Sequence, residues 1–109
     1  MKQLSILAVA LSLVSSSTLA GEMFGTISEG GKPVSEGVKV VVAAGEKTYS
    51  AETDKFGSYR LFVKEKGKCI LKVHFKDQTP SFQVASFEKS TRYDFVLNLK
   101  DGKYTLGRK

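Results

Sequence analysis

Apolar and polar residues alternate in short runs from Gly21 onward, and this pattern predicts β-strands. The runs are rich in valine, isoleucine, phenylalanine, tyrosine and threonine, and Gly or Asp-Gly residues separate them. No segment has a convincing helical period. The predicted strands are 23–28, 38–43, 48–53, 58–65, 69–75, 81–86 and 91–99. Seven short strands predict an all-β fold, a seven-stranded immunoglobulin-like sandwich.

The segment between the third and fourth predicted strands contains residues that favour a tight turn. Asp54 can accept hydrogen bonds from the amides that follow it, and Gly57 can adopt positive φ without a Cβ clash. If residues 55–57 form a hairpin loop, Ala51 lies opposite Leu61 and the apolar side chains share one face. We therefore predict a hairpin with Asp54 and Gly57 as its structural turn residues.

A second hairpin is predicted by the same counting. A loop at 66–68 places Leu61 opposite Val73, and the inward row of this pair is again apolar. The outward row mixes positive charge with two large apolar side chains. Its members are Arg60, Phe62, Lys64, Ile70, Lys72 and His74. This face is either solvated or meets a partner.

The last predicted strand keeps the alternation, with Tyr93, Phe95, Leu97 and Leu99 on its inward side. Asp101-Gly102 then signals a turn. The basic tail that follows carries Tyr104 and Leu106, which could dock as one more edge segment.

The beginning of the chain has the layout of a secretory signal. Lys2 precedes an apolar run at 4–14, and small residues lead to Ala20. The run is about half the roughly 20 residues that a spanning helix needs. We expect residues 1–20 to be removed as a signal peptide and 21–109 to form one domain, secreted or periplasmic and without a membrane span.

Charge and cysteine content add two expectations. The predicted leader carries one basic residue and no acid, so its removal lowers the formal charge from +6 to +5. A net positive charge of this size is common in soluble proteins, and it would also favour binding to an acidic partner. Cys69 is the only cysteine, so we expect packing to stabilise the domain and the thiol to be buried, with a disulfide-linked dimer as the alternative.

Two stretches resemble a known family. They are GKPVSEGVKV at 31–40 and TDKFGSYRL at 53–61. A Gly-x-Pro-Val loop before a Val-rich strand, followed by a Thr-Asp-x-x-Gly-x-Tyr turn, is similar to the carboxypeptidase regulatory-like domain. The resemblance covers roughly the first half of residues 21–109. It implies a transthyretin-like (prealbumin-like) sandwich and an accessory, structural or binding role.

The sequence contains no pattern typical of a catalytic or metal-binding site. His74 is the only histidine, and alternation places it on an outward face between Lys72 and Lys76. Transthyretin-like hydroxyisourate hydrolases use several histidines and a C-terminal Tyr-Arg-Gly-Ser, whereas this chain ends LGRK. The acids are scattered without calcium-loop spacing. We predict no catalytic residue, no cofactor and no metal.

The remaining candidate is the predicted basic face, which we assign as a partner-binding surface. Its residues are Arg60, Phe62, Lys64, Ile70 and Lys72. The expected partner is a protein or an envelope polysaccharide, and not nucleic acid. Two alternatives stay open: a structural envelope protein that self-associates, and a small hydrolase with a pocket that gathers His74 with Arg60 or Arg92.

Overall fold

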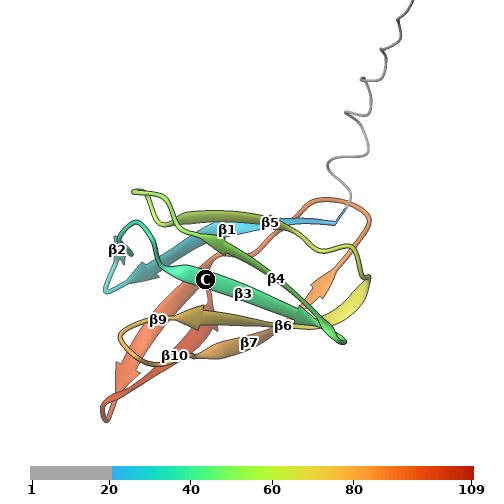
Figure 1. The fold of residues 1–109 in the computed structure, drawn as a ribbon. Helices are drawn as coiled ribbons and strands as arrows, with labels where there is room; N and C mark the ends of the chain where they lie inside the picture. Colours follow the sequence, from blue (N-terminus) through green and yellow to red (C-terminus); the bar gives the residue numbers. More distant parts are fainter. Residues whose placement is uncertain (1–20) are drawn as a thin grey trace, which may run out of the picture.

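The computed structural model describes residues 21–109, so the predicted signal peptide lies outside the described residues. This part of the chain forms strands joined by turns (Figure 1). The strands are β1 (Glu22–Glu29), β2 (Lys32–Pro33), β3 (Lys39–Ala44), β4 (Lys47–Glu52), β5 (Ser58–Phe62), β6 (Gly67–His74), β7 (Ser81–Ser86), β8 (Thr91–Arg92), β9 (Phe95–Lys100) and β10 (Lys103–Arg108).

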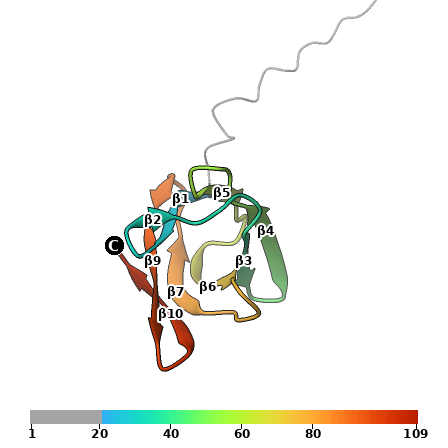
Figure 2. The ribbon, with the colours of Figure 1, turned by 90° about the vertical axis from the view of Figure 1, so that its left-hand side faces the viewer.

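The strands form two sheets. In the first sheet β1 is central: β5 and β2 pair with it antiparallel, β8 and β9 pair with it parallel, and β10 continues beyond β9. The second sheet has the order β4-β3-β6-β7 and is antiparallel throughout. Figure 2 shows β1, β9 and β10 on one side of the molecule and β3 and β4 on the other. The fold is therefore an all-β sandwich, as predicted.

The core lies between the sheets because each strand turns its apolar residues inward. The most deeply buried large side chains come from both layers, and alternation along the strands puts their neighbours outside. They are Met23, Ile27, Phe95 and Leu97 in the first sheet, Val40, Val42, Leu71 and Val73 in the second, and Val63 directly after β5. The inward and outward faces predicted from the sequence match this burial on β5 and β6.

The predicted pairing of the two hairpins is wrong. β4 pairs with β3, whereas β5 pairs with β1 in the other sheet, so Ala51 lies opposite Val40 and Leu61 lies opposite Met23. β6 pairs with β3 and β7 and does not pair with β5. The chain crosses between sheets at both turns. Alternation fixes which face a residue occupies, but it leaves the partner strand undetermined.

The strand count also differs from the prediction. Residues 21–109 contain ten strand segments, because β2 and β10 are added and the predicted strand 91–99 divides into β8 and β9. The tail docks as the edge strand β10, with Leu106 opposite Leu97. Its hairpin turn projects from the body in Figures 1 and 2.

The division between β8 and β9 falls at Tyr93 and Asp94, and hydrogen bonds bridge it. The amide of Tyr93 donates to the carbonyl of Phe24 at 2.8 Å, and Oδ1 of Asp94 accepts from the amide of Thr26 at 2.8 Å. A side-chain carboxylate thus replaces a backbone carbonyl beside β1. Gly25 lies against the break: a Cβ on it would lie only 1.8 Å from the Tyr93 carbonyl oxygen.

Two tyrosines connect the break to the rest of the sandwich. The buried Tyr59 hydroxyl donates to the carbonyl of Tyr93 at 2.8 Å. The Tyr93 hydroxyl accepts from the amide of Ala85 at 3.0 Å and lies 3.1 Å from the Ala85 carbonyl, to which it donates. Burial is the main reason that the pKa of Tyr59 is raised, so this hydroxyl remains a donor.

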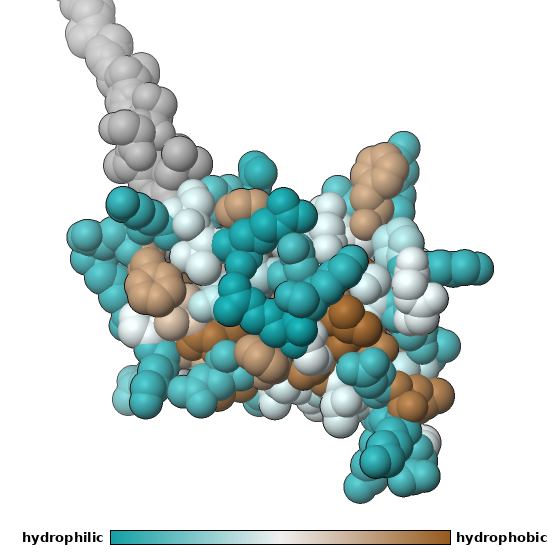
Figure 3. Space-filling view, turned by 180° about the vertical axis from the view of Figure 1, so that it is seen from behind, coloured by the Kyte–Doolittle hydropathy of each residue, from teal (hydrophilic) through white to brown (hydrophobic). Residues whose placement is uncertain are grey.

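The surface carries a few large apolar side chains. The exposed ones are Phe56, Phe62, Ile70, Phe87 and Leu99. On the side seen in Figure 3, hydrophobic groups are scattered among hydrophilic ones and gather in a band across the lower half. Within residues 21–109, no helix has the length and apolar character needed to cross a membrane.

Candidate functional site

The outer face of the first sheet places two arginines on either side of an aromatic ring. Phe24 on β1 lies opposite Arg60 on β5 and, on its other side, opposite Arg92 on β8. One step along the same face, Thr26 lies opposite Ser58. In the other direction, Phe62 is 45% exposed and lies opposite Glu22. Phe24, Thr26, Arg60 and Phe62 point outward because they alternate with the buried row of β1 and β5.

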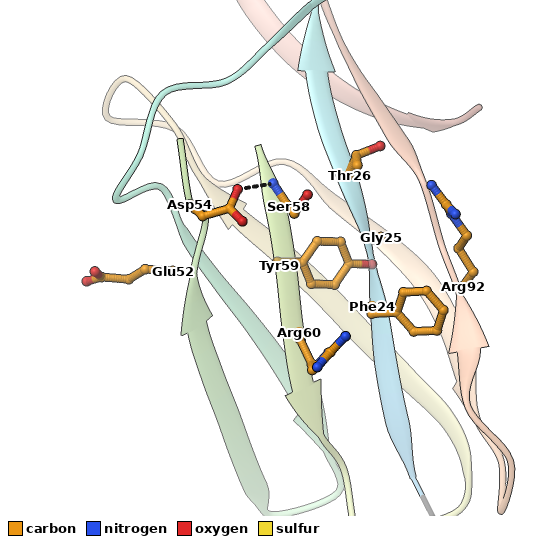
Figure 4. A pocket seen from close by; sticks show the side chains of 9 residues that line it. All are labelled: Phe24, Gly25, Thr26, Glu52, Asp54, Ser58, Tyr59, Arg60 and Arg92. Carbon is orange, nitrogen blue, oxygen red and sulfur yellow. Dashed lines mark hydrogen bonds between the residues drawn. The ribbon is translucent and has the colours of Figure 1, made fainter. Parts of the chain in front are cut away.

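This face forms the wall and floor of an open groove of about 590 Å³. Figure 4 shows Phe24 between Arg60 and Arg92, with Asp54 and Ser58 at the upper end. The Glu52 carboxylate is directed away from the other labelled side chains. The groove is lined by Phe24, Gly25, Thr26, Glu52, Asp54, Ser58, Tyr59, Arg60 and Arg92.

Arg60 is held by the buried carboxylate of Glu22 on the neighbouring strand β1. Its Nε lies 2.8 Å from Oε2 of Glu22, whose side chain is only 6% exposed, while the Arg60 side chain is 67% exposed. The Ser90 hydroxyl donates to the other Glu22 oxygen at 2.6 Å. A buried carboxylate needs such partners, and the pair in turn restricts the orientation of the arginine.

Arg92 is held in a similar way by Asp94. Its Nε donates to Oδ2 at 2.9 Å, and the Arg92 side chain is 61% exposed. Burial raises the pKa of Asp94, but hydrogen bonds from the Thr26 amide, Arg92 and the Thr26 hydroxyl outweigh burial. The net result is a pKa below the ordinary value, so the carboxylate is charged and fixes Arg92 at neutral pH.

The upper end of the groove is shaped by the turn after β4. Oδ1 of Asp54 accepts from the amides of Phe56 and Ser58 at 2.9 and 3.0 Å. Gly57 has φ of 74°, and a Cβ there would lie 2.7 Å from the Ile27 carbonyl oxygen. These are the roles expected of the two residues, although the turn joins strands of different sheets.

The five residues predicted as a partner-binding face do not lie on one surface. Arg60 and Phe62 share the outer face of the first sheet, and Lys64 follows β5 in the turn toward β6. Ile70 and Lys72 belong to β6 and point outward from the second sheet. The predicted face is divided because β5 and β6 do not pair.

The other predicted candidates lie away from the groove. His74 is exposed at the end of β6, on the outer face of the second sheet, so the structure does not gather it with Arg60 or Arg92. Cys69 is buried and free, as expected, and burial raises the pKa of its thiol. Among the described residues, no cluster of three or more His, Cys, Asp or Glu could hold a metal ion.

The predicted partner-binding face leaves out Phe24, Thr26 and Arg92, and Arg92 is named only for the alternative hydrolase pocket with His74. Their outward orientation could have been found, because Phe24 and Thr26 alternate with Met23 and Ile27. The pairing of β1 with β5 and β8, which brings them to Arg60, could not. Thr26 and Asp94, which meet here, are 68 positions apart in the chain.

Comparison with known proteins adds a fold-level similarity. No family model matches the chain, and no curated protein matches it. The chain is similar to a crystal structure from Bacteroides ovatus described as a "putative cell adhesion protein", with a TM-score of 0.48 and 12% identity. The similarity covers 83% of this chain and 43% of that one. At this identity and TM-score it gives no information on function.

Proposed function

We propose that the chain is an exported, non-enzymatic interaction module, secreted or periplasmic after removal of residues 1–20. Its partner is a protein or an envelope polysaccharide, which binds in the groove between Arg60 and Arg92. The resemblance of 31–40 and 53–61 to carboxypeptidase regulatory-like domains supports an accessory binding role and a transthyretin-like arrangement of the sandwich.

One observation carries the proposal: a partly exposed aromatic ring lies between two arginines that buried or partly buried carboxylates hold in place. Oriented guanidinium groups and an aromatic surface are common contact groups in binding sites. Glu22 and Asp94 already have structural partners, and Asp54 stabilises its own turn. Carboxylates engaged in this way favour a binding surface over proton transfer.

The test is an affinity pull-down from envelope extract with residues 21–109, which contain both sheets and the core. The wild type is compared with the groove variant Phe24→Leu/Arg92→Gln and with Ile70→Ala/Lys72→Ala on the opposite outer face. Thermal melting checks that both variants are folded. We expect one specific component to be recovered by the wild type and the opposite-face variant and lost by the groove variant. Equal recovery by both variants would exclude the groove as the binding site.

A further inference from the structure

The groove contains two arginines, but the carboxylates that line it or pair with its arginines outnumber them. Each guanidinium is paired with a carboxylate, Arg60 with Glu22 and Arg92 with Asp94. Glu52 and Asp54 then add two negative charges to the lining, which contains no other basic residue. The groove therefore lacks the excess of positive charge that attracts a polyanion. A cationic ligand would meet two guanidinium groups that are more than half exposed.

The polar groups of the groove are suited to a ligand that both donates and accepts hydrogen bonds. Arg60 and Arg92 can only donate, whereas Asp54 can only accept when ionised. The Ser58 hydroxyl lies on the same face and can do both, and the Thr26 hydroxyl, which donates to Asp94, can still accept. Sugar hydroxyls have the same dual character, since each carries one proton and two lone pairs.

Aromatic surface runs along the same face. Phe24 lies opposite Arg60, and Phe62 lies one pair further along β5, opposite Glu22. Phe24 and Phe62 are thus diagonal neighbours, and such positions are about 7–8 Å apart in an antiparallel pair. The C–H face of a sugar ring packs against a phenyl ring through dispersion and burial of apolar surface. Two rings in a row suit a chain of sugars in an open groove.

From these features we infer that the groove, together with Phe62 beside it, binds a neutral, hydroxyl-rich polysaccharide, with sugar rings on Phe24 and Phe62 and hydroxyls bonded to the arginines and Asp54. The inference rests on the proposed function and specifies its ligand class. An acidic polymer would instead suit the basic side chains of the opposite outer face. There Lys39, Lys72 and His74 lie on neighbouring strands.

The test is affinity electrophoresis of residues 21–109 in gels that contain one polymer each. The neutral polymers are amylose, mannan and xyloglucan, and the acidic ones are polygalacturonate and alginate. Phe24→Leu keeps apolar volume but removes the flat ring, and Phe87→Leu makes the same change at an exposed phenylalanine outside the groove. Asp54→Asn keeps the turn acceptor and removes the negative charge.

We expect at least one neutral polymer to retard the wild type. The retardation should change little between about 50 and about 500 mM salt, a range over which interactions between exposed charges become screened. Phe24→Leu should weaken binding by roughly 3- to 10-fold, as expected for loss of about 1 kcal/mol of ring contact. Asp54→Asn should weaken it by a few-fold, and Phe87→Leu should leave it unchanged.

Other outcomes overturn the inference, and they separate it from the proposed function. Retardation only by acidic polymers, and only at low salt, would show that the ligand class is wrong. No retardation, combined with groove-dependent capture of a protein in the pull-down, would also exclude the polysaccharide but leave the interaction module standing. If no polymer retards the protein and the groove variant captures the same components as the wild type, both proposals fail.

Discussion

Asp94 links the fold to the groove at the scale of a single residue. Oδ1 accepts from the Thr26 amide and hydroxyl, and Oδ2 accepts from Nε of Arg92. The same carboxylate therefore bridges the break between β8 and β9 and orients one of the two groove arginines. Protonating it would weaken a structural contact and a site contact together.

The pH dependence of stability follows from this environment. The pKa of Asp94 is lower in the fold than its ordinary value of 3.8, so its contribution is complete above about pH 5 and is lost as the pH falls through the folded pKa. We expect the free energy of unfolding, measured by urea titration, to fall below pH 4. Asp94→Asn should be less stable at pH 7 and show a smaller fall. Asp77→Asn, in the turn between β6 and β7, is the matched control, and an identical pH profile for Asp94→Asn and wild type would contradict the role of Asp94.

Cys69 offers a second test at the residue scale. Its side chain is buried, and burial raises the pKa of the thiol, so little reactive thiolate is present at neutral pH. We expect a thiol reagent such as dithionitrobenzoate to label the native protein far more slowly than the urea-unfolded protein. We also expect a monomer on a non-reducing gel. Rapid labelling of the native state, or a disulfide-linked dimer, would show that Cys69 is accessible.

At the scale of elements, β1 and the β8–β9 segment approach each other so closely that Gly25 has no room for a side chain. We expect Gly25→Ala to lower the free energy of unfolding by about 3 kcal/mol, because the added Cβ would collide with the Tyr93 carbonyl. Gly107→Ala is the matched control on β10, since its Cβ would lie 3.5 Å from Nδ2 of Asn98, an ordinary contact. That variant should change stability by less than about 1 kcal/mol. Denaturant titration of both variants measures these changes. Equal losses of unfolding free energy in Gly25→Ala and Gly107→Ala would contradict the close approach of β1 to the Tyr93 carbonyl.

The strands themselves were largely predictable, whereas their partners were not. The prediction for 81–86 coincides with β7, and the inward positions of β5 and β6 are buried as expected. A period of two residues specifies the face of a strand within a sheet and carries no information on which strand lies beside it. The prediction of a hairpin at Asp54 and Gly57 is wrong because the same turn residues and φ values can also join strands of two different sheets.

At the scale of the whole molecule, the candidate site could be predicted only in part. Arg60 and Phe62 are expected on an exposed face; Arg60 lines the groove and Phe62 lies beside it. The predicted face groups Ile70 and Lys72 with them through a pairing that does not occur. It leaves out Phe24, and Arg92 is expected only in the alternative hydrolase pocket with His74. The site depends on contacts between strands far apart in the sequence, and alternation within each strand cannot supply these.

The central place of β1 in the first sheet also determines when that sheet can be completed. β1 comes first among the described strands, yet its parallel neighbours β8 and β9 come near the end of the chain. β3, β4, β6 and β7 can pair with one another as soon as residues 39–86 are available. Synthesis proceeds from the N-terminus. The edge of β1 that pairs with β8 and β9 therefore stays unpaired until those two strands have been synthesised. Pairing over such separations slows folding, so we expect the first sheet to be completed after the second.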